Sequence, residues 1–445
     1  MWSWSWPRAG LLTAAALLAL ASGQIPSLCS GPEQLWSRRC CPAWWADGSA
    51  CGNVSGRGWC RRLERAGEQR AAAGSGAGGA DFRLGWPGYF YEEVCECRPR
   101  YHGSDCGECA AGWAGPGCRR PHLVKRLNLW AMPEAQRDRF LDRLLQAKRT
   151  DSLRYLIYGS ASPRPGSPLC LRRASIYDVF AWAHYVCVKR RGDGQPGSFA
   201  HRGPAFPCWH RAYLLFFERE MRNLTGDPDF FVPYWSWAGQ PACDVCVDTI
   251  FGSSNASGLL NQASRFQQWP TFCLEESSHE LDFELVCPPG PKRLIRRTPS
   301  VSGDLPSLQD VRSSLLLPIY DTHPYNESAL GSFRNTLEGF LLPSDPQTLY
   351  PSMHNMVHYF CGGTMSNAAY SANDPLFLSH HAYIDKIFEM WLRSHPGNSI
   401  YPRDPSIPHG HRADDTMPPF IPVVANQDFM KSSLEFGYTY SEMTT

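Results

Sequence analysis

The sequence predicts a mainly α-helical domain that follows a small disulfide-rich module. Ten of the 18 cysteines lie between Cys29 and Cys118, in a stretch with little hydrophobic periodicity. From Pro133 onwards apolar residues recur at helical spacing, and the composition becomes that of a core-forming domain. We therefore expect three regions: a signal peptide at residues 1–23, the disulfide-rich module at 24–121, and the helical domain with an irregular C-terminal wrap at 122–445.

The N-terminus carries the pattern of a secretory signal peptide. An apolar run from Leu11 to Ala21 follows Arg8, and small residues at Ala21-Ser22-Gly23 suit signal peptidase. An even number of cysteines at this density is typical of an oxidising compartment. Four sequons predict N-glycosylation, at Asn53, Asn223, Asn255 and Asn326. We expect a glycoprotein of the secretory lumen, since no later stretch approaches the roughly 18 apolar residues of a membrane span.

The module has its densest cysteine pattern between Cys95 and Cys118. This stretch resembles epidermal growth factor-like and laminin-like modules, in which glycines make tight turns between bridges. Paired cysteines can also bind zinc, but a secreted chain oxidises such pairs, so disulfides are favoured. Further along, residues 240–332 lack periodicity and predict loops, stapled by local bridges between Cys243 and Cys246 and between Cys273 and Cys287.

The composition argues against a polyanionic partner. The formal net charge is +1 and only 19% of the residues are charged. No basic stripe with interleaved aromatic residues is present, so nucleic acid binding is not expected. Most of the 16 tryptophans are expected to fill a core.

The clearest chemical signal is a set of three histidines in the second half of the chain. His354 and His358 are four residues apart, so on a helix they lie on one face. A second helix should begin near residues 373–375, where Asn or Asp can cap and Pro can start it, and should carry His381 toward the same point. The adjacent His380 lies about 100° around that helix and is not expected to be a ligand.

A second set of three histidines lies earlier in the helical domain. His184 falls on a predicted helix over residues 176–189, and His201 and His210 lead into an apolar helical run over residues 212–222. A single buried histidine is more often an ordinary core residue, but two matched sets favour metal binding. No carboxylate or thiolate accompanies them at the same spacing. Imidazole suits copper, zinc, iron and nickel, and ligand type alone does not choose among them.

Several motifs resemble the vertebrate tyrosinase family of type 3 copper enzymes, over essentially the whole chain. They are His201-x8-His210-Arg211, Tyr234-Trp235-Ser236-Trp237, the run from Ser332 to Phe340, and both stretches of the second histidine set. The resemblance implies a four-helix bundle with two copper ions and dioxygen as co-substrate. In it, CuA would be held by His184, His201 and His210, and CuB by His354, His358 and His381.

The activity that the resemblance implies is the initiation of melanin synthesis. Such an enzyme hydroxylates monophenols such as L-tyrosine to o-diphenols and oxidises these, L-DOPA among them, to o-quinones. The family resemblance also implies residence in the melanosome. Family members continue to a membrane helix, which this chain as given does not reach; a monomer is expected.

Further residues near the metals also match the family pattern. Glu338 and Asn355 match a pair that would hold a water able to accept the phenol proton, and a carboxylate near two metal charges should stay ionised. A helix-surface glutamate and a capping asparagine are the alternative readings. Ser371 matches a small residue at the substrate mouth, and Phe340 and Val357 would stack on or wedge the substrate ring.

Departures from the family pattern leave alternatives open. Arg202-Gly203 resembles the branch of zinc-containing dopachrome tautomerases, whereas His380-His381 favours the oxidase because the non-oxidase relatives resemble Leu-His there. A dioxygen carrier of hemocyanin type would need a lid and larger assemblies, and a vestigial site would need broken histidine sets; the sequence indicates neither. The cysteines without an evident partner in the family pattern are Cys170, Cys187, Cys208 and Cys361.

Overall fold

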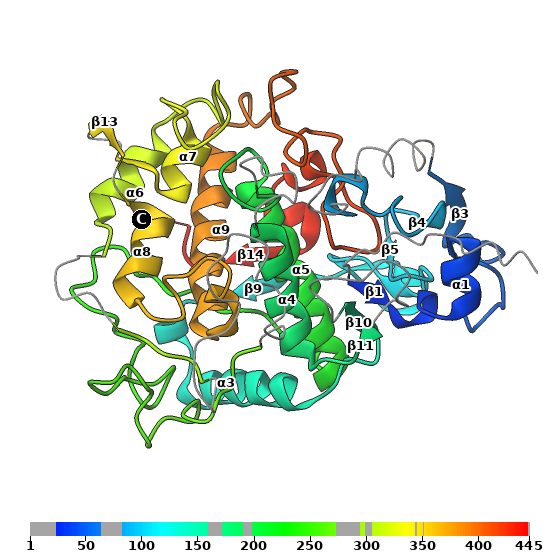
Figure 1. The fold of residues 1–445 in the computed structure, drawn as a ribbon, viewed down its shortest axis with the longest axis horizontal. Helices are drawn as coiled ribbons and strands as arrows, with labels where there is room; N and C mark the ends of the chain where they lie inside the picture. The colour runs from blue at the N-terminus through cyan, green and yellow to red at the C-terminus, as the bar shows by residue number, and fades with distance from the viewer. Residues whose placement is uncertain are drawn as a thin grey trace, which may run out of the picture.

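The computed structural model describes residues 24–63, 82–158, 171–189, 198–272, 294–298, 305–342, 345–349 and 351–443. The predicted signal peptide and three cysteines, Cys170, Cys273 and Cys287, lie outside these ranges. Figure 1 shows a helical body with a strand-rich region at one side, which is coloured blue because it comes first in the chain.

Short strands and disulfides build the N-terminal part. Strands β2 (Arg39–Cys40), β4 (Glu93–Cys97) and β3 (Gly58–Arg62) form a sheet in the order β2-β4-β3, in which β2 is parallel and β3 antiparallel to β4. Hairpins follow, β5 (Tyr101–His102) with β6 (Glu108–Cys109) and β7 (Trp113–Ala114) with β8 (Arg120–Pro121). The short helices of this part are η1 (Ser27–Cys29), α1 (Pro32–Ser37) and η3 (Pro116–Cys118).

Five disulfides confirm the predicted disulfide-rich module. They join Cys29 to Cys40, Cys41 to Cys60, Cys51 to Cys95, Cys97 to Cys106 and Cys109 to Cys118. The predicted local bridge between Cys243 and Cys246 is also present. The bridges lie between short strands and turns, so covalent links supply much of the order in this part of the chain.

Two segments of the predicted module belong structurally to the helical domain. Strand β1 (Ile25–Pro26) pairs with β10 (Tyr155–Tyr158), which also pairs with β11 (Leu171–Arg172). The helix η2 (Phe82–Gly85) opens a buried stretch in which the Trp86 indole N–H donates to the Phe420 carbonyl at 3.1 Å. One continuous apolar core therefore includes residues from both predicted regions.

Four helices carry all of the predicted histidine ligands except His201, which lies in the loop before α5 (Phe206–Thr225). The other three are α4 (Ile176–Val188), α8 (Met353–Cys361) and α9 (Leu376–Ser394), and α3 (Glu134–Arg149) packs on α4 and α5. In Figure 1 α9 lies between α8 on one side and α4 and α5 on the other. The predicted start of α9 is confirmed to within a residue, because the Asp374 carboxylate accepts the Leu376 N–H at 3.0 Å.

The prediction that residues 240–332 form only loops is wrong at one place. Helix α6 (Leu308–Leu315) lies within this stretch. The Ser307 hydroxyl accepts the Asp310 N–H while the Asp310 carboxylate accepts the Ser307 N–H, so a capping box starts the helix despite its short apolar pattern. Helix α7 (Phe333–Glu338) and strands β12 (Leu341–Leu342) and β13 (Asp345–Leu349) follow it.

The C-terminal segment wraps the helical domain, as predicted. Strand β14 (Tyr438–Tyr440) pairs in parallel with β9 (Val124–Arg126), the first strand after the module. Short helices η4 (Leu129–Ala131), η5 (Ser371–Asn373), η6 (Asn426–Phe429) and η7 (Ser433–Phe436) complete the fold. Among the described residues, no helix has both the length and the apolarity needed to cross a membrane.

Hydrogen bonds to a buried carboxylate tie this wrap to α9, and ion pairs join the same carboxylate to α5 and β9. The Arg211 guanidinium on α5 donates to Asp385 on α9 at 2.6 Å, and Arg126 of β9 donates to the same carboxylate at 3.0 Å. The hydroxyls of Tyr438 and Tyr440 on β14 also donate to Asp385. We call these five side chains the Asp385 network.

Candidate metal centre

Two groups of histidines have ligand atoms close enough to share a metal ion. His184, His201 and His210 form one group, and His354, His358, His380 and His381 form the other; within each group the ligand atoms lie within 4.8 Å of one another. All six predicted ligands are thus brought together in the predicted sets. The nitrogens of His380 also lie within the second group, although its angle around the helix predicts that it is not a ligand.

The first group draws on two helices and the loop between them. His184 lies on α4, which begins where the Ser175 hydroxyl accepts the Asp178 N–H at 3.1 Å. His210 lies in the first turns of α5, and its Nδ1 lies 2.8 Å from the Phe206 carbonyl one turn earlier. A ring N–H directed at that carbonyl leaves Nε2 as the ligand atom.

The loop that carries His201 is held from both sides. The Ser198 hydroxyl accepts the His201 N–H at 3.0 Å. His411, from the C-terminal wrap, contacts the Ser198 carbonyl through Nε2, and its Nδ1 accepts the Ala205 N–H at 3.3 Å. A Cβ at Gly203 would lie 2.7 Å from the His411 ring, so glycine is required for this close approach.

The second group draws on two facing helices. His354 and His358 lie one turn apart on α8, with 3.1 Å between their Nε2 atoms. The His358 Nδ1 lies 2.7 Å from the Met365 carbonyl, which orients the other nitrogen toward His354. His381 comes from α9, and the ring of His380 stacks on that of His354 at a centroid distance of 5.2 Å.

The two groups face each other across a short gap. The rings of His210 and His381 are stacked with their centroids 4.3 Å apart, and those of His201 and His354 are 5.8 Å apart. Helices α5 and α9 bring the first pair together, since the Arg211–Asp385 ion pair joins the same two helices directly after His210 and one turn after His381. The arrangement is that of one binuclear site.

The donor set fits metal ions. Buried ring nitrogens without a hydrogen-bond partner occur on His184, His201, His210, His380 and His381. Burial lowers the pKa of all seven histidines, to about 3 for His210 and about 4 for His358, although carbonyls that accept from these two rings oppose the shift. At neutral pH the imidazoles are therefore neutral, which is the form that binds a metal.

Glu338 lies fully buried beside the second group. Its Oε1 accepts the Arg202 N–H at 2.6 Å, its Oε2 accepts from the Arg334 guanidinium at 3.2 Å, and its backbone carbonyl lies 3.2 Å from the His354 Nδ1. Burial raises the pKa of Glu338 to about 7, against the opposing effect of Arg334. Without metal charges, the protein's own groups thus place this carboxyl near the middle of its titration at neutral pH; the expected ionised form depends on the two metal charges.

Asn355 meets Glu338 at the same ring nitrogen. The Asn355 Oδ1 lies 3.0 Å from the His354 Nδ1, next to the Glu338 carbonyl. The close packing requires Gly339, whose Cβ would lie 3.0 Å from the Asn355 nitrogen and 1.9 Å from the Ser352 carbonyl oxygen. The two residues predicted to act as a pair are therefore neighbours.

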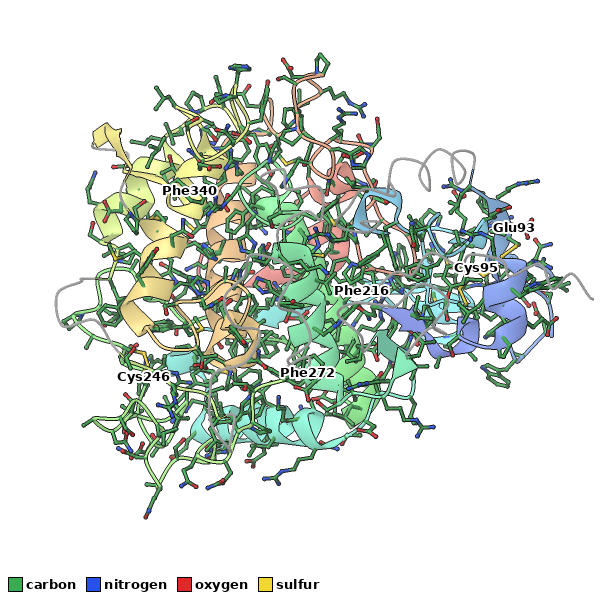
Figure 2. The ribbon with its side chains drawn as sticks, viewed as in Figure 1. Glu93, Cys95, Phe216, Cys246, Phe272 and Phe340 are labelled. Carbon is green, nitrogen blue, oxygen red and sulfur yellow. A yellow bond between two sulfur atoms is a disulfide. The ribbon has the colours of Figure 1, made fainter. Side chains whose placement is uncertain are left out.

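The three predicted substrate residues differ in exposure. Phe340 is half-buried, and the centroid of its ring lies 5.8 Å from the Arg202 guanidinium carbon. Figure 2 labels Phe340 near α7. Val357 and Ser371 are buried, and the Ser371 hydroxyl donates to the Ala368 carbonyl at 3.2 Å. Phe340 is thus placed to meet a ligand from solvent, whereas the described structure gives Val357 and Ser371 no exposed surface.

The remaining predicted residues take ordinary positions. Of the glycosylation candidates, Asn53, Asn223 and Asn255 are exposed and Asn326 is half-buried. Cys208 and Cys361 are buried thiols whose pKa burial raises to about 12. Such thiols are protonated at neutral pH and unreactive.

Comparison with known proteins gives one consistent result. Residues 174–394 match the sequence profile described as the common central domain of tyrosinase. The chain is 38% identical to the tyrosinase of Felis catus over 445 residues, which covers 95% of this chain and 82% of the relative. Identity is 36% to the tyrosinase of Pelophylax lessonae over 97% of this chain and 84% of the relative. It is 35% to the 5,6-dihydroxyindole-2-carboxylic acid oxidase of Ambystoma mexicanum, over 96% of this chain and 85% of the relative.

Proposed function

The chain belongs to the tyrosinase family, and from that premise we propose that it hydroxylates monophenols such as L-tyrosine to o-diphenols and oxidises o-diphenols such as L-DOPA to o-quinones. It is an oxidoreductase that uses two copper ions and dioxygen. The observation that carries the proposal is the pair of facing groups of buried, neutral imidazoles. The reaction would start melanin synthesis in the lumen of the melanosome.

Each copper ion would have three imidazole ligands. His184, His201 and His210 would hold CuA, and His354, His358 and His381 would hold CuB. The bound ions supply the two-electron redox chemistry with dioxygen that no side chain can perform. His380 would stay beside CuB without binding it, stacked on His354.

Glu338 would move the phenol proton. Its Oε1 and Oε2 are oriented by the Arg202 N–H and the Arg334 guanidinium, which in turn binds Asp321 through two hydrogen bonds of 2.9 and 3.0 Å. Asn355 beside it would help to hold the water that relays the proton. Burial raises the pKa of this carboxyl and Arg334 lowers it, and the charges of the bound ions would favour the ionised form that accepts a proton.

The protein would also orient the ring and exclude water. The imidazoles are buried except on the side of His358 and Asn355, which keep partial exposure, so a small phenol would enter there. Phe340 would stack on the ring at this opening. Val357 and Ser371 are buried, so they would shape the substrate site from behind its surface residues. We expect the enzyme to work as a monomer.

Metal analysis combined with oxygen uptake tests this function. Purified enzyme should contain about two coppers per chain and should consume oxygen with both a tyrosine-like phenol and its catechol. The His358→Ala variant should lose one copper and nearly all of both activities, because it removes a ligand from one ion. The His122→Ala variant is the matched control, since His122 pairs with Asp229 outside both groups.

Two results would overturn the proposal. Oxygen uptake that persists in His358→Ala would show that the second histidine group is not the oxidising site. Stoichiometric zinc without oxygen uptake would instead favour a dopachrome tautomerase-like isomerase, the alternative that Arg202-Gly203 suggests.

A further inference from the structure

Arg202 occupies the rim of the metal centre. It follows His201 directly, and its backbone N–H donates to the buried Glu338 carboxylate at 2.6 Å. Its guanidinium lies 5.8 Å from the centroid of the Phe340 ring, and 57% of the side chain is exposed. One residue thus contacts the proposed proton acceptor through its backbone and the proposed ring-stacking residue through its side chain.

The backbone of Arg202 is in an unusual conformation. Its φ is +62°, in the left-handed region that glycine adopts most readily. The arginine could not stand one position later instead, because any side chain at residue 203 would collide with the His411 ring. A long cationic side chain is kept at a strained position, and such strain concentrates at functional sites.

The ionic partner of Arg202 is weakly held. The Arg202 Nη1 lies 3.5 Å from the Glu327 Oε1, and the two side chains are 57% and 40% exposed. Exposed pairs of this kind contribute little, since water screens them. The other carboxylate nearby, Glu338, already binds Arg334. The Arg202 guanidinium is therefore available to exchange Glu327 for a carboxylate brought by a ligand.

We propose that Arg202 is a specificity-determining residue that binds the carboxylate of phenolic acids at the mouth of the copper site. The inference rests on the proposed function and names the substrate class that the site prefers. A phenol whose ring stacks on Phe340 would direct the far end of its side chain to the guanidinium above that ring. Arginine offers a planar pair of N–H donors that matches a carboxylate, so acids are favoured over amines of the same length.

Steady-state kinetics with two matched substrates test the proposal. 3-(4-Hydroxyphenyl)propionate carries a carboxylate, and tyramine carries an ammonium group on a chain of similar length. Arg202→Gln should raise KM for the acid about tenfold, equivalent to about 1.4 kcal/mol, with kcat nearly unchanged, and should leave or lower KM for tyramine. Arg202→Lys should recover part of the loss, because it keeps the charge without the planar fork.

Two further variants sharpen the test. Glu327→Gln should lower KM for the acid by removing the competing carboxylate. Arg39→Gln is the matched control, since Arg39 pairs with Glu93 at 3.0 Å with side-chain exposures of 53% and 39%, close to those of the Arg202 pair, but in the module. It should change neither KM.

A binding measurement separates this inference from the proposed function. 3-Phenylpropionate lacks the phenol hydroxyl, so its binding to the full-length metal-free chain can be followed by NMR titration without turnover. Arg202→Gln should weaken it about tenfold, even if no phenol is oxidised. Equal changes in KM for acid and amine, or unchanged 3-phenylpropionate binding, would overturn the role of Arg202.

Discussion

The N-terminal module and the helical domain are held together by different links. In the module there are five disulfides, and the ion pairs Arg39–Glu93 and Arg61–Glu96 are exposed to solvent. In the helical domain the central ion pair, Arg211–Asp385, is buried. Arg39 and Glu93 represent the first kind, with about half and two fifths of their side chains exposed. Arg211 and Asp385 represent the second, with side chains that are 0% and 1% exposed. The same two charges thus occur in two very different environments.

The difference teaches how each region is stabilised. A disulfide acts mainly by restricting the unfolded chain, so it tolerates small shifts in the folded strands. A buried ion pair is sensitive to geometry, because removal of one partner leaves an uncompensated charge in a medium of low polarity. The buried Arg211–Asp385 pair lies next to the proposed ligands His210 and His381, where two helices must hold a fixed relative position.

The substitution expected to have the largest effect on stability is Asp385→Asn. Loss of the charge leaves Arg126 with Glu218 and Arg211 with Glu389 as their buried carboxylate partners, so we expect the free energy of unfolding to fall by up to about 3–5 kcal/mol. Metal content should fall with it, because α5 and α9 then keep only the Arg211–Glu389 pair of their ionic links. Urea unfolding followed by tryptophan fluorescence, together with metal analysis, measures both effects.

The pH dependence of this contribution follows from the pKa of Asp385. Burial alone would raise that pKa, but Arg211 and Arg126 hold it below its ordinary value. The stabilisation is therefore complete above the unfolded-state pKa of about 4 and is lost as the pH falls through the folded-state value. The difference in stability between wild type and Asp385→Asn should be constant from pH 6 to 8, roughly, and should shrink in acid.

Two control variants complete this test. Asp414→Asn removes a carboxylate that is 72% exposed and pairs with Arg403, and should cost about 0–1 kcal/mol. Tyr440→Phe removes one donor from Asp385 and provides a milder variant if Asp385→Asn does not fold. A cost for Asp385→Asn no greater than that for Asp414→Asn would contradict the assigned role of the Asp385 network.

Removal of the disulfide that closes the longest loop in the module should destabilise the protein less than Asp385→Asn, and only locally. Cys51 and Cys95 are 44 residues apart, and the double substitution to alanine should destabilise the module by about 2–4 kcal/mol. The copper content should be kept, because no ligand lies on the module. Limited proteolysis of the full chain, compared with metal analysis, measures this separation, and metal loss as large as in Asp385→Asn would refute it.

The sequence predicted the helices and the two histidine groups well, because both depend on local spacing. His354 and His358 lie on one helical turn whatever the tertiary structure, and the caps near residue 374 are set by neighbouring side chains. The disulfide-rich module was likewise evident from cysteine density. Helix α6 is not predicted by hydrophobic periodicity, because a capping box at Ser307 and Asp310 sets its start.

What the sequence could not reveal depends on contacts between distant residues. The place of His380 in the second histidine group follows from how α8 and α9 approach each other, and the helical angle alone argued against it. The packing of Trp86 against Phe420 joins segments 334 residues apart, so no local pattern could assign it to the helical domain. The pKa of Glu338 likewise depends on burial and on Arg334 together.

The smallest expected effect belongs to the exposed pair in the module. Arg39→Gln should change the free energy of unfolding by at most about 1 kcal/mol, because solvent screens the interaction with Glu93 and the free side chains regain conformational entropy. A double-mutant cycle with Glu93→Gln isolates the pairwise energy, and that energy should decrease further as the salt concentration rises. A coupling of several kcal/mol, insensitive to salt, would mean that the module also depends on its ion pairs, and the contrast with the Asp385 network would then be one of degree.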